Sequence, residues 1–559
     1  MAVAAPTDEA LAPAGEIRGA NPFFGMSRAQ VVAAVGRLAA AIVRHPTVLV
    51  SEVADLTSER LRILAGVGTT KIDPKDKRFA DPAWSHPLWS RLALLYLAGD
   101  EALDRVVDRV GLDPKSEARA RFATMQISAA AAPTNTLLGN PAAIKRAVAT
   151  RGRSIFDGVR HLAHDIRTNG GMPSQVDTRP FVIGENVACT PGAVVHRTDV
   201  FELLQYRPTT PTVHERPTII VPPQVNKYYF LDLAPGRSFV EHSVSQGIQT
   251  FMISWRNPTP EQRDWSIDTY LHGVQEAIDV VRDITGSPDT NAMALCAGGL
   301  TLLMLLAHQS AVGNDAVNAV TLGVTGVDTQ AESVITLLAS RRTMEASVAR
   351  SRRKGVLEGR SMSNVFAWVR PNDLVWNYVA NNYLLGLNPP AFDVLAWNSD
   401  STNLPAAFHA EFIDVIGENA LCKPGAARAL GSPIDLRIVK NDMYVVGALT
   451  DHLVPWTATY AVTQVTSGHH RFVLSNSGHI QALVNPPGNP KAGFLVGDEY
   501  PADPNEWLRL ARKEQGSWWV DWAAWTVERS GEKRKARRSL GGRAHKPLGD
   551  APGRYVHQR

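Results

Sequence analysis

A segment near the middle of the chain, Asn291 to His308, combines three kinds of local structure in a short space. Asn291 to Leu295 is an apolar run of strand length, Gly298 and Gly299 permit a tight turn, and Leu300 to His308 has the composition of a buried helix. A strand that runs through a sharp turn into a helix is the unit from which helix-covered, mostly parallel sheets are built. This segment therefore predicts an α/β fold.

The sequence from Arg216 onward repeats this alternation of short apolar runs and helical patterns. Trp265 to Ile284 reads as an amphipathic helix between two such runs. The predicted buried strands are Thr218 to Val221, Thr250 to Trp255, Asn291 to Cys296, Val317 to Val324, Asp442 to Leu449 and Arg471 to Leu474.

The first 205 residues differ in character, because helical patterns such as Ala29 to Val43 and Ser116 to Ala132 dominate there. A chain of 559 residues exceeds the size at which single cores usually stop growing. We therefore predict a mainly helical N-terminal domain, residues 1–205, followed by an α/β catalytic domain, residues 206–559.

Two parts of the catalytic domain depart from the βα rhythm. Residues 328–435 are rich in Trp, Tyr, Asn and Pro, and we expect them to form an insertion between two core strands that acts as a cap. Residues 529–559 carry ten Lys or Arg against two acidic residues, so this tail has a net charge of +8 and the rest of the chain −4. Such a charge run is more often a solvated terminus than a binding site for anions.

Cys296 lies where the turn of the central segment is sharpest. The nucleophile elbow of α/β-hydrolases reads Gly-x-Ser-x-Gly, because small flanking residues let the nucleophile adopt a strained turn above the sheet. Here Ala294 replaces the first glycine and Cys296 replaces the serine. The alternative is that Cys296 is a buried, inert thiol, the usual fate of a free cysteine.

The order of the following polar residues favours catalysis. This fold supplies its triad in the order nucleophile, acid, histidine, and Asp451 and His479 each follow a predicted strand. Taken singly, Asp451 could be a turn residue and His479 a surface histidine. His452 is a competing base, but its neighbour Asp451 cannot easily orient it, so we expect a supporting role.

A thiol needs such a base, since only a few per cent of free cysteine is thiolate at neutral pH. We predict that His479 activates Cys296 and that Asp451 orients the imidazole. The oxyanion would be held by the backbone N–H of Ala297 and by an N–H from the loop after the first predicted strand. Prolines 222 and 223 have no N–H, which leaves Gln224 or Val225, unless this loop is only a rigid turn.

Composition excludes several other classes of protein. No apolar run approaches the roughly 20 residues of a spanning helix, and the N-terminus has neither the basic start nor the apolar stretch of a secretory signal, so we expect a cytoplasmic protein. The three cysteines form no C-x-x-C pair, so we expect no disulfide and no metal site. No nucleic-acid-binding signature is present.

Many blocks of this sequence, in order, resemble the polyhydroxyalkanoate synthases, which polymerise (R)-3-hydroxyacyl-CoA thioesters into storage polyester. The likeness covers nearly the whole chain. It includes KRFADPAW (77–84), APTNTLLGNPAAIKRA (132–147), TPGAVVHRTDVFELLQYRP (190–208), VPPQVNKYYFLDLAP (221–235), ISWRNPT (253–259), VRPNDLVWNYVANNYLLG (369–386), WNSDSTNLPAAFH (397–409), DHLVPW (451–456), LSNSGHIQALVNPPGNPKA (474–492) and GSWWVDW (516–522).

The resemblance implies that Cys296, Asp451 and His479 are the nucleophile, acid and base. NGGMPSQV (169–176), QRDW (262–265) and SNSGHIQ (475–481) are most similar to the class II branch, a single-subunit type associated with medium-chain monomers. It further implies an acyltransferase without a cofactor, whose CoA is only a leaving group, acting as a homodimer on cytoplasmic polyester granules. The family elbow usually begins with Gly, so Ala294 is a departure that bears on side-chain length preference.

Two other functions remain open from the sequence. A hydrolase of the same fold, such as an esterase or polyester depolymerase, would share the triad, although Cys in place of Ser argues against it. A non-enzymatic granule-associated protein could use the basic tail and exposed aromatic side chains.

Overall fold

The computed structural model describes residues 28–331 and 341–559. Contacts within the chain divide these residues into two compact units. The first unit holds the described residues up to 177, residues 341–347 and Ser361–Ala391, and the second holds the remainder. The N-terminal segment 1–19, for which we predict no secretory signal, lies outside the described part of the chain.

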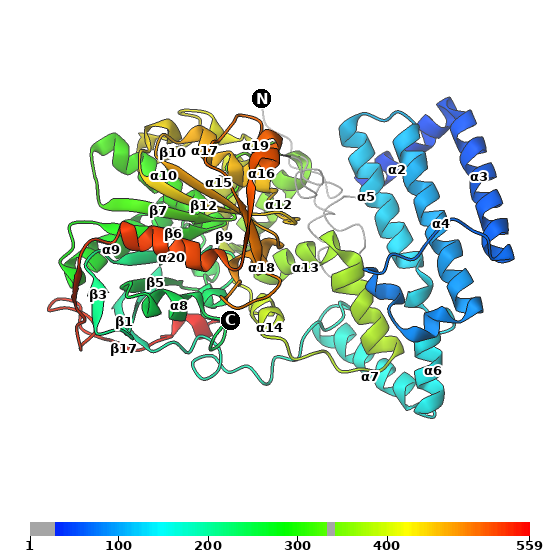
Figure 1. The fold of residues 1–559 in the computed structure, drawn as a ribbon, viewed down its shortest axis with the longest axis horizontal. Coiled ribbons are helices and arrows are strands. Elements are labelled where there is room, and N and C mark those ends of the chain that lie inside the picture. Colours follow the sequence, from blue (N-terminus) through cyan, green and yellow to red (C-terminus); the bar gives the residue numbers. More distant parts are fainter. Residues whose placement is uncertain (1–27, 332–340) are drawn as a thin grey trace. The chain divides into compact units, whose positions relative to one another are not determined.

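The first unit is helical, as predicted (Figure 1). Four of its helices, α3, α4, α5 and α6, begin with proline. Proline suits the first helical turn because it lacks an N–H, and an N–H at that position would have no acceptor within the helix. The helices and turns of the N-terminal segment are α2 (Arg28–Arg44), α3 (Pro46–Ala65), η1 (Lys77–Phe79), η2 (Pro82–Ser85), α4 (Pro87–Arg109), α5 (Pro114–Ala131), η3 (Pro133–Asn135), α6 (Pro141–Ala149) and α7 (Arg153–Thr168).

Part of the predicted insertion packs within this first unit. The segment Ser361–Ala391 contains most of α13 (Gly359–Val369) and two π-helical turns, η6 (Asn372–Trp376) and η7 (Val379–Leu384). Met172 shares a hydrophobic cluster with Trp368 of α13, whose carbonyl accepts a hydrogen bond from Gln126 Nε2 at 2.8 Å. The insertion is thus divided between the units and does not act as one element.

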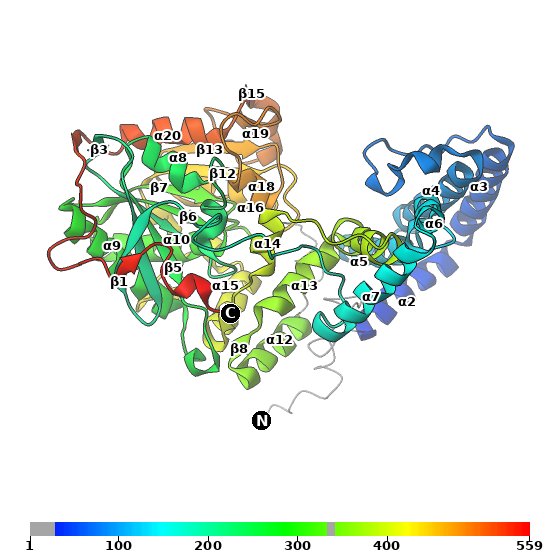
Figure 2. The ribbon, with the colours of Figure 1, turned by 90° about the horizontal axis from the view of Figure 1, so that it is seen from below.

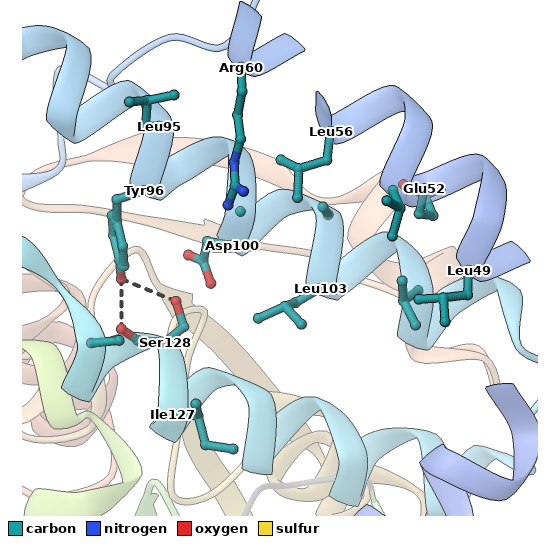
Figure 3. Close-up of a pocket in the computed structure, with 15 residues that line it drawn as sticks. Leu49, Glu52, Leu56, Arg60, Leu95, Tyr96, Asp100, Leu103, Ile127 and Ser128 are labelled. Carbon is teal, nitrogen blue, oxygen red and sulfur yellow. Dashed lines mark hydrogen bonds between the residues drawn. The ribbon is translucent and has the colours of Figure 1, made fainter. Parts of the chain in front are cut away.

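The first unit also has an apolar pocket of about 410 Å³ between α3, α4 and α5. Figure 3 shows Leu49, Leu56, Leu103 and Ile127 around it. None of the predicted site residues lines this pocket.

The second unit is built on one large sheet, as predicted. Within the described residues eleven strands form this sheet, with six parallel strands at its centre and antiparallel strands at both ends. Its order is β15 (Arg512–Gln515), β14 (Gly493–Val496), β13 (His470–Ser475), β12 (Asp442–Ala448), β7 (Val317–Gly323), β6 (Thr290–Leu295), β4 (Thr218–Val221), β5 (Thr250–Trp255), β2 (Phe201–Tyr206), β1 (Gly192–Arg197) and β17 (Gly549–Asp550).

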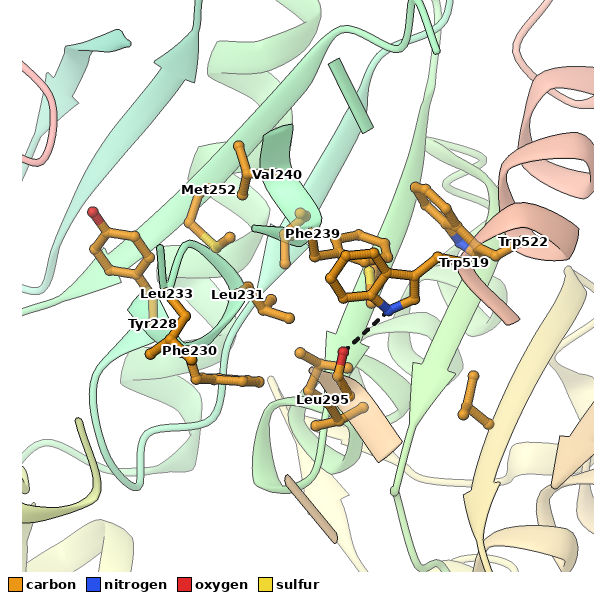
Figure 4. Close-up of a cluster of buried hydrophobic side chains, with 14 of the residues drawn as sticks. Tyr228, Phe230, Leu231, Leu233, Phe239, Val240, Met252, Leu295, Trp519 and Trp522 are labelled. Carbon is orange, nitrogen blue, oxygen red and sulfur yellow. Dashed lines mark hydrogen bonds between the residues drawn. The ribbon is translucent and has the colours of Figure 1, made fainter. Parts of the chain in front are cut away.

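Helices cover both faces of this sheet (Figures 1 and 2). On one face α8 (Phe239–Ser245) and α20 (Trp518–Glu528) bury aromatic side chains against Leu295 of β6. Figure 4 shows Phe239, Trp519 and Trp522 gathered in this cluster. On the other face α9 (Ile267–Thr285) packs beside α10 (Ala297–Val312).

The second unit also carries short elements between and around these strands. They are β3 (Thr212–His214), η4 (Tyr228–Leu231), η5 (Pro260–Gln262), α12 (Arg341–Lys354, shared with the first unit), β8 (Val356–Leu357), α14 (Asp393–Ser399), β9 (Leu404–Pro405), α15 (Ala406–Gly417), η8 (Ala420–Cys422), β10 (Arg428–Ala429), β11 (Ser432–Pro433), η9 (Leu436–Ile438), α16 (Trp456–Tyr460), α17 (Val462–Val465), α18 (His479–Leu483), α19 (Pro504–Leu510), β16 (Lys533–Lys535) and η10 (Tyr555–His557).

The boundary between the units differs from the predicted one at residue 205. The second unit begins at Thr178, because β1 and β2 pair with each other and β2 with β5, which makes them part of the large sheet. Residues 190–206 lack the regular alternation of apolar and polar side chains that marks a strand with one exposed face. The reason is that β2 is buried on both faces.

Most of the Lys and Arg side chains of the basic tail are exposed to solvent, as predicted, but its backbone is paired with strands of the second unit. Its strand β16 pairs with β3, and β17 pairs with β1. Arg534 and Arg537 donate hydrogen bonds to the last carbonyls of α9, and Val556 is buried. These arginines occupy the carbonyl end of a helix, where cations are stabilised.

Among the described helices no single one is long and apolar enough to cross a membrane. One pair, 33–44 with Pro46–Ala65, meets the length and composition test together but is bent by 93°.

Candidate active site

Cys296 follows β6, a central strand of the sheet, and directly precedes α10. Its backbone lies in the left-handed region, with φ 48° and ψ −122°. For a residue with a Cβ this conformation costs about 1–3 kcal/mol and persists only where the surroundings enforce it. Its N–H donates to the Gly323 carbonyl at 2.9 Å, which fixes the end of β6 against β7. The strained turn predicted for an elbow is therefore present.

The two glycines after Cys296 allow α10 to start this close to neighbouring segments. A Cβ on Gly298 would lie 2.6 Å from the Pro222 carbonyl oxygen, and one on Gly299 would overlap the Thr325 side chain. No larger residue fits either position without displacing backbone or a buried side chain. The spacing of small residues is thus required by packing as well as by the turn.

Ala294 is accommodated within the regular part of β6. It pairs with Val221 of β4 on one side and Leu322 of β7 on the other, and it is completely buried. The left-handed turn begins two residues later, at Cys296. The Ala294 methyl group therefore occupies an ordinary strand position, where glycine would be less favourable.

Asp451 and His479 lie together, as predicted. They follow β12 and β13, which are neighbouring parallel strands, so both residues leave the sheet at the same edge. His479 Nδ1 lies 2.6 Å from Asp451 Oδ2, and the two side chains are 6% and 0% exposed. Asp451 Oδ1 also accepts hydrogen bonds from two backbone N–H groups of its own loop, those of Leu453 and Val454.

The charge of Asp451 controls the protonation of His479. Burial lowers the pKa of this imidazole, but the Asp451 carboxylate, its hydrogen bond and the adjacent Cys296 side chain outweigh burial and raise the pKa to about 10. The imidazolium is therefore the stabilised form of His479 beside the Asp451 carboxylate. Such a site can hold a proton taken from Cys296.

His452 is half-buried beside Asp451 in the same loop, where its predicted supporting role stays a prediction.

The predicted oxyanion donors lie beside the elbow. Ala297 is the first residue of α10, so its N–H has no acceptor within the helix. We call residues 222–227, which follow β4, the oxyanion loop. Val221, where β4 ends, pairs with Ala294, and Gln224 Nε2 donates to Thr301 Oγ1 of α10 at 3.1 Å. The loop that carries Gln224 and Val225 is thus hydrogen-bonded to α10, the helix that directly follows Cys296.

A further group of residues around this loop was not identified from the sequence. Thr402 Oγ1 contacts two backbone groups of the loop, and Asp400 Oδ1 lies 2.8 Å from Lys227 Nζ, which also donates to the Val556 carbonyl at 2.6 Å. Burial lowers the pKa of Lys227 in this position. The local signal in the sequence is a polar run, Ser399 to Asn403, within the insertion.

The two other cysteines lack comparable surroundings. Burial, with Asp328 nearby, raises the pKa of Cys422 to about 11, and burial together with Asp232 raises the pKa of Cys189. Both thiols are therefore harder to ionise than free cysteine. Within residues 28–331 and 341–559, no group of three or more His, Cys, Asp or Glu side chains could hold a metal ion.

Comparisons with known proteins agree with this architecture. Residues 75–243 match the family model of the poly-beta-hydroxybutyrate polymerase (PhaC) N-terminus, and residues 227–486 match that of the alpha/beta hydrolase fold. Poly(3-hydroxyalkanoate) polymerases 1 and 2 of Ectopseudomonas oleovorans are 45% and 42% identical to this chain, covering 97% and 98% of it and the same shares of their own lengths. Poly(3-hydroxyalkanoate) polymerase subunit PhaC of Cupriavidus necator is 40% identical over 86% of this chain and 83% of its own. The chain therefore belongs to the poly(3-hydroxyalkanoate) polymerase family.

Proposed function

We propose that this enzyme polymerises (R)-3-hydroxyacyl-CoA into polyhydroxyalkanoate through a thioester on Cys296, with release of CoA. The observation that carries the proposal is the buried His479–Asp451 pair, with its 2.6 Å contact, beside a cysteine held in a left-handed turn after a central strand. The identity of the chain to poly(3-hydroxyalkanoate) polymerases supports the choice of substrate.

In the first half-reaction His479 takes the proton of the Cys296 thiol. The thiolate attacks the thioester carbonyl, and the resulting oxyanion accepts hydrogen bonds from the Ala297 N–H and an N–H of the oxyanion loop. The tetrahedral adduct then breaks its bond to the CoA sulfur, which leaves as a thiol with the proton from His479. The acyl group is now a thioester of Cys296.

In the second half-reaction the 3-hydroxyl of another hydroxyacyl unit attacks this thioester, and His479 accepts the hydroxyl proton. An ester bond forms, and the Cys296 thiolate is released and reprotonated. Sulfur suits this sequence because exchange of one thioester for another keeps the acyl group activated. A serine would hold it as a more stable ester.

Water must be kept from the acyl-enzyme for polymer to form. We assign this role to the aromatic residues of that part of the insertion which belongs to the second unit, such as Trp397. Residues 332–340 of the insertion lie outside the described part of the chain. We also propose, from the family resemblance, that no cofactor is needed and that the enzyme works as a homodimer on the surface of cytoplasmic polyester granules.

The test compares three cysteine variants in the release of CoA from (R)-3-hydroxyoctanoyl-CoA. Cys296→Ala should reduce release by at least about 10³-fold, since the nucleophile is lost. Cys422→Ala and Cys189→Ala, the matched controls, should retain most of the wild-type rate. Unchanged release from Cys296→Ala would refute the mechanism and favour a non-enzymatic granule protein.

Product analysis distinguishes the remaining alternative. The polymerase should give a polyester that is insoluble in water and soluble in chloroform. Free 3-hydroxyoctanoic acid as the main product would identify an esterase or depolymerase instead.

A further inference from the structure

The hydroxyl of Thr402 joins two consecutive peptide groups of the oxyanion loop. Thr402 Oγ1 accepts a hydrogen bond from the Asn226 N–H and donates one to the Gln224 carbonyl, each at 2.9 Å. A hydroxyl has one donor, so its proton is committed to the loop. Thr402 is 4% exposed, so water does not compete for these bonds.

These two bonds fix the orientation of Val225. The Gln224 carbonyl and the Val225 N–H belong to one planar trans peptide group, in which they point in opposite directions. The Asn226 N–H belongs to the next peptide group, and Asn226 itself has a left-handed backbone, with φ 69°. By holding both peptide groups, Thr402 determines the direction in which the Val225 N–H points. The bond to the Gln224 carbonyl also polarises that peptide and makes its N–H a better donor.

Thr402 is itself held by contacts that do not involve its hydroxyl. The backbone N–H of the next residue, Asn403, donates to Asn257 Oδ1 at 2.8 Å, and Asn403 Nδ2 donates to the Pro258 carbonyl at 3.1 Å. The Thr402 carbonyl is packed against Gly359, where a Cβ would lie 2.3 Å from it. The position of the residue is thus independent of the two bonds that its side chain makes to the loop.

From this arrangement we infer that Thr402 is a positioning residue that aims the Val225 N–H at the oxyanion. Val225, and not Gln224, is then the second donor beside Ala297. The Asn226 N–H is unavailable because Thr402 already accepts it. The inference rests on the proposed function, since it assigns a role within the same acyl transfer.

The test replaces Thr402 by valine, which has the same shape but no hydroxyl. Thr402→Val should lower kcat for CoA release from (R)-3-hydroxyoctanoyl-CoA by about 10- to 100-fold, the range expected when an oxyanion donor is misplaced. KM should change by less than about threefold, because the ground-state thioester makes little use of this donor. Thr402→Ser keeps the hydroxyl and should restore kcat to within about threefold of the wild type.

A second measurement separates positioning from general damage. The rate at which iodoacetamide alkylates Cys296, resolved from Cys189 and Cys422 by peptide mass spectrometry, depends on the thiolate and not on an oxyanion donor. It should be the same in Thr402→Val as in the wild type. The control Thr285→Val removes a buried hydroxyl that donates to the Val281 carbonyl within α9, and it should leave kcat unchanged.

Two results would overturn the inference. One is a Thr402→Val kcat equal to that of Thr402→Ser, and the other is a loss of kcat matched by an equal loss of alkylation rate. Either would leave the proposed function intact if Cys296→Ala still abolishes CoA release. Activity in Cys296→Ala would instead defeat the proposed function itself.

Discussion

Asp451 uses both carboxylate oxygens to hold a single geometry. One oxygen accepts hydrogen bonds from two backbone N–H groups of the loop that carries Asp451, and the other oxygen contacts His479. The backbone contacts fix the carboxylate, and the carboxylate fixes the imidazole, which is the preorganisation that the proposed role of His479 as base requires. A histidine that is nearly buried would otherwise favour its neutral form. Its raised pKa shows that the ionic contact outweighs burial.

This pair gives the stability of the fold a pH dependence of known sign. The pKa of His479 is about 10 in the fold and about 6.5 when unfolded. The contribution of the His479–Asp451 pair to the free energy of unfolding is therefore complete below a pH of about 6.5, and it is lost as the pH rises through about 10. Relative to Asp451→Asn, the urea midpoint of the wild type should fall over this interval.

Urea unfolding followed by tryptophan fluorescence at several pH values measures the effect. Asp498→Asn is the control, because Asp498 forms an exposed pair with Arg512 and stays ionised over the same interval. Its curve should run parallel to that of the wild type. Parallel curves for Asp451→Asn and the wild type would contradict the prediction.

The sheet and its turns were largely predictable because their signals are local. Strands β4 and β5 have the predicted bounds, and β6, β7, β12 and β13 differ from theirs by one or two residues. The fold class and the pairing of Asp451 with His479 followed from strand ends and chain order. Thr402 could not be found in this way, since its partners in the loop are more than 170 residues away in sequence. A buried threonine has no local pattern that reveals such a contact.

The tight packing at the start of α10 predicts that alanine substitution at two helical glycines changes the free energy of unfolding differently. Gly299→Ala should lower the free energy of unfolding by about 1–3 kcal/mol, because its Cβ would overlap the buried Thr325 side chain. Gly273→Ala in α9 is the matched control, since its Cβ would lie 3.5 Å from Phe201, an ordinary contact. It should be neutral or stabilise by up to about 1 kcal/mol. Thermal unfolding of both variants provides the comparison, and equal melting temperatures would contradict it.

The two units are connected through the insertion as well as through the N-terminal segment. Ser361–Ala391 packs in the first unit, where Asp165 accepts a hydrogen bond from the Tyr383 hydroxyl at 2.9 Å and Gln175 donates to the Leu374 carbonyl at 2.6 Å. The sequence alone does not predict that this part of the insertion packs in the first unit. An insertion and an N-terminal segment show their apolar faces, but not which face covers which.

Deletion of residues 1–177 should therefore do more than remove a domain. It would expose Trp368 and Val375, which lose their cluster with Met172, and leave the contacts of Tyr383 and Leu374 unmade. We expect the shortened protein to bind a hydrophobic dye and to melt at least about 5 °C below the full chain.

The control for this deletion also replaces Ser361–Ala391 with a Gly/Ser linker of similar length. Removal of the exposed segment should reduce dye binding and recover solubility. A shortened protein that melts like the full chain without this replacement would show that the insertion does not depend on the first unit.

The contacts of Lys227 have a consequence for how the site is assembled during folding. Its ammonium group meets a carbonyl 329 residues further along the chain, and Thr402 reaches the same loop from the insertion. Contacts of such high sequence separation form late, because the entropy of closing a long loop is lost before they are gained. A chain whose central strands and elbow are already formed would still lack a fixed oxyanion loop. Catalytic activity would then report the last stage of folding of the second unit, whereas secondary structure would report an earlier one.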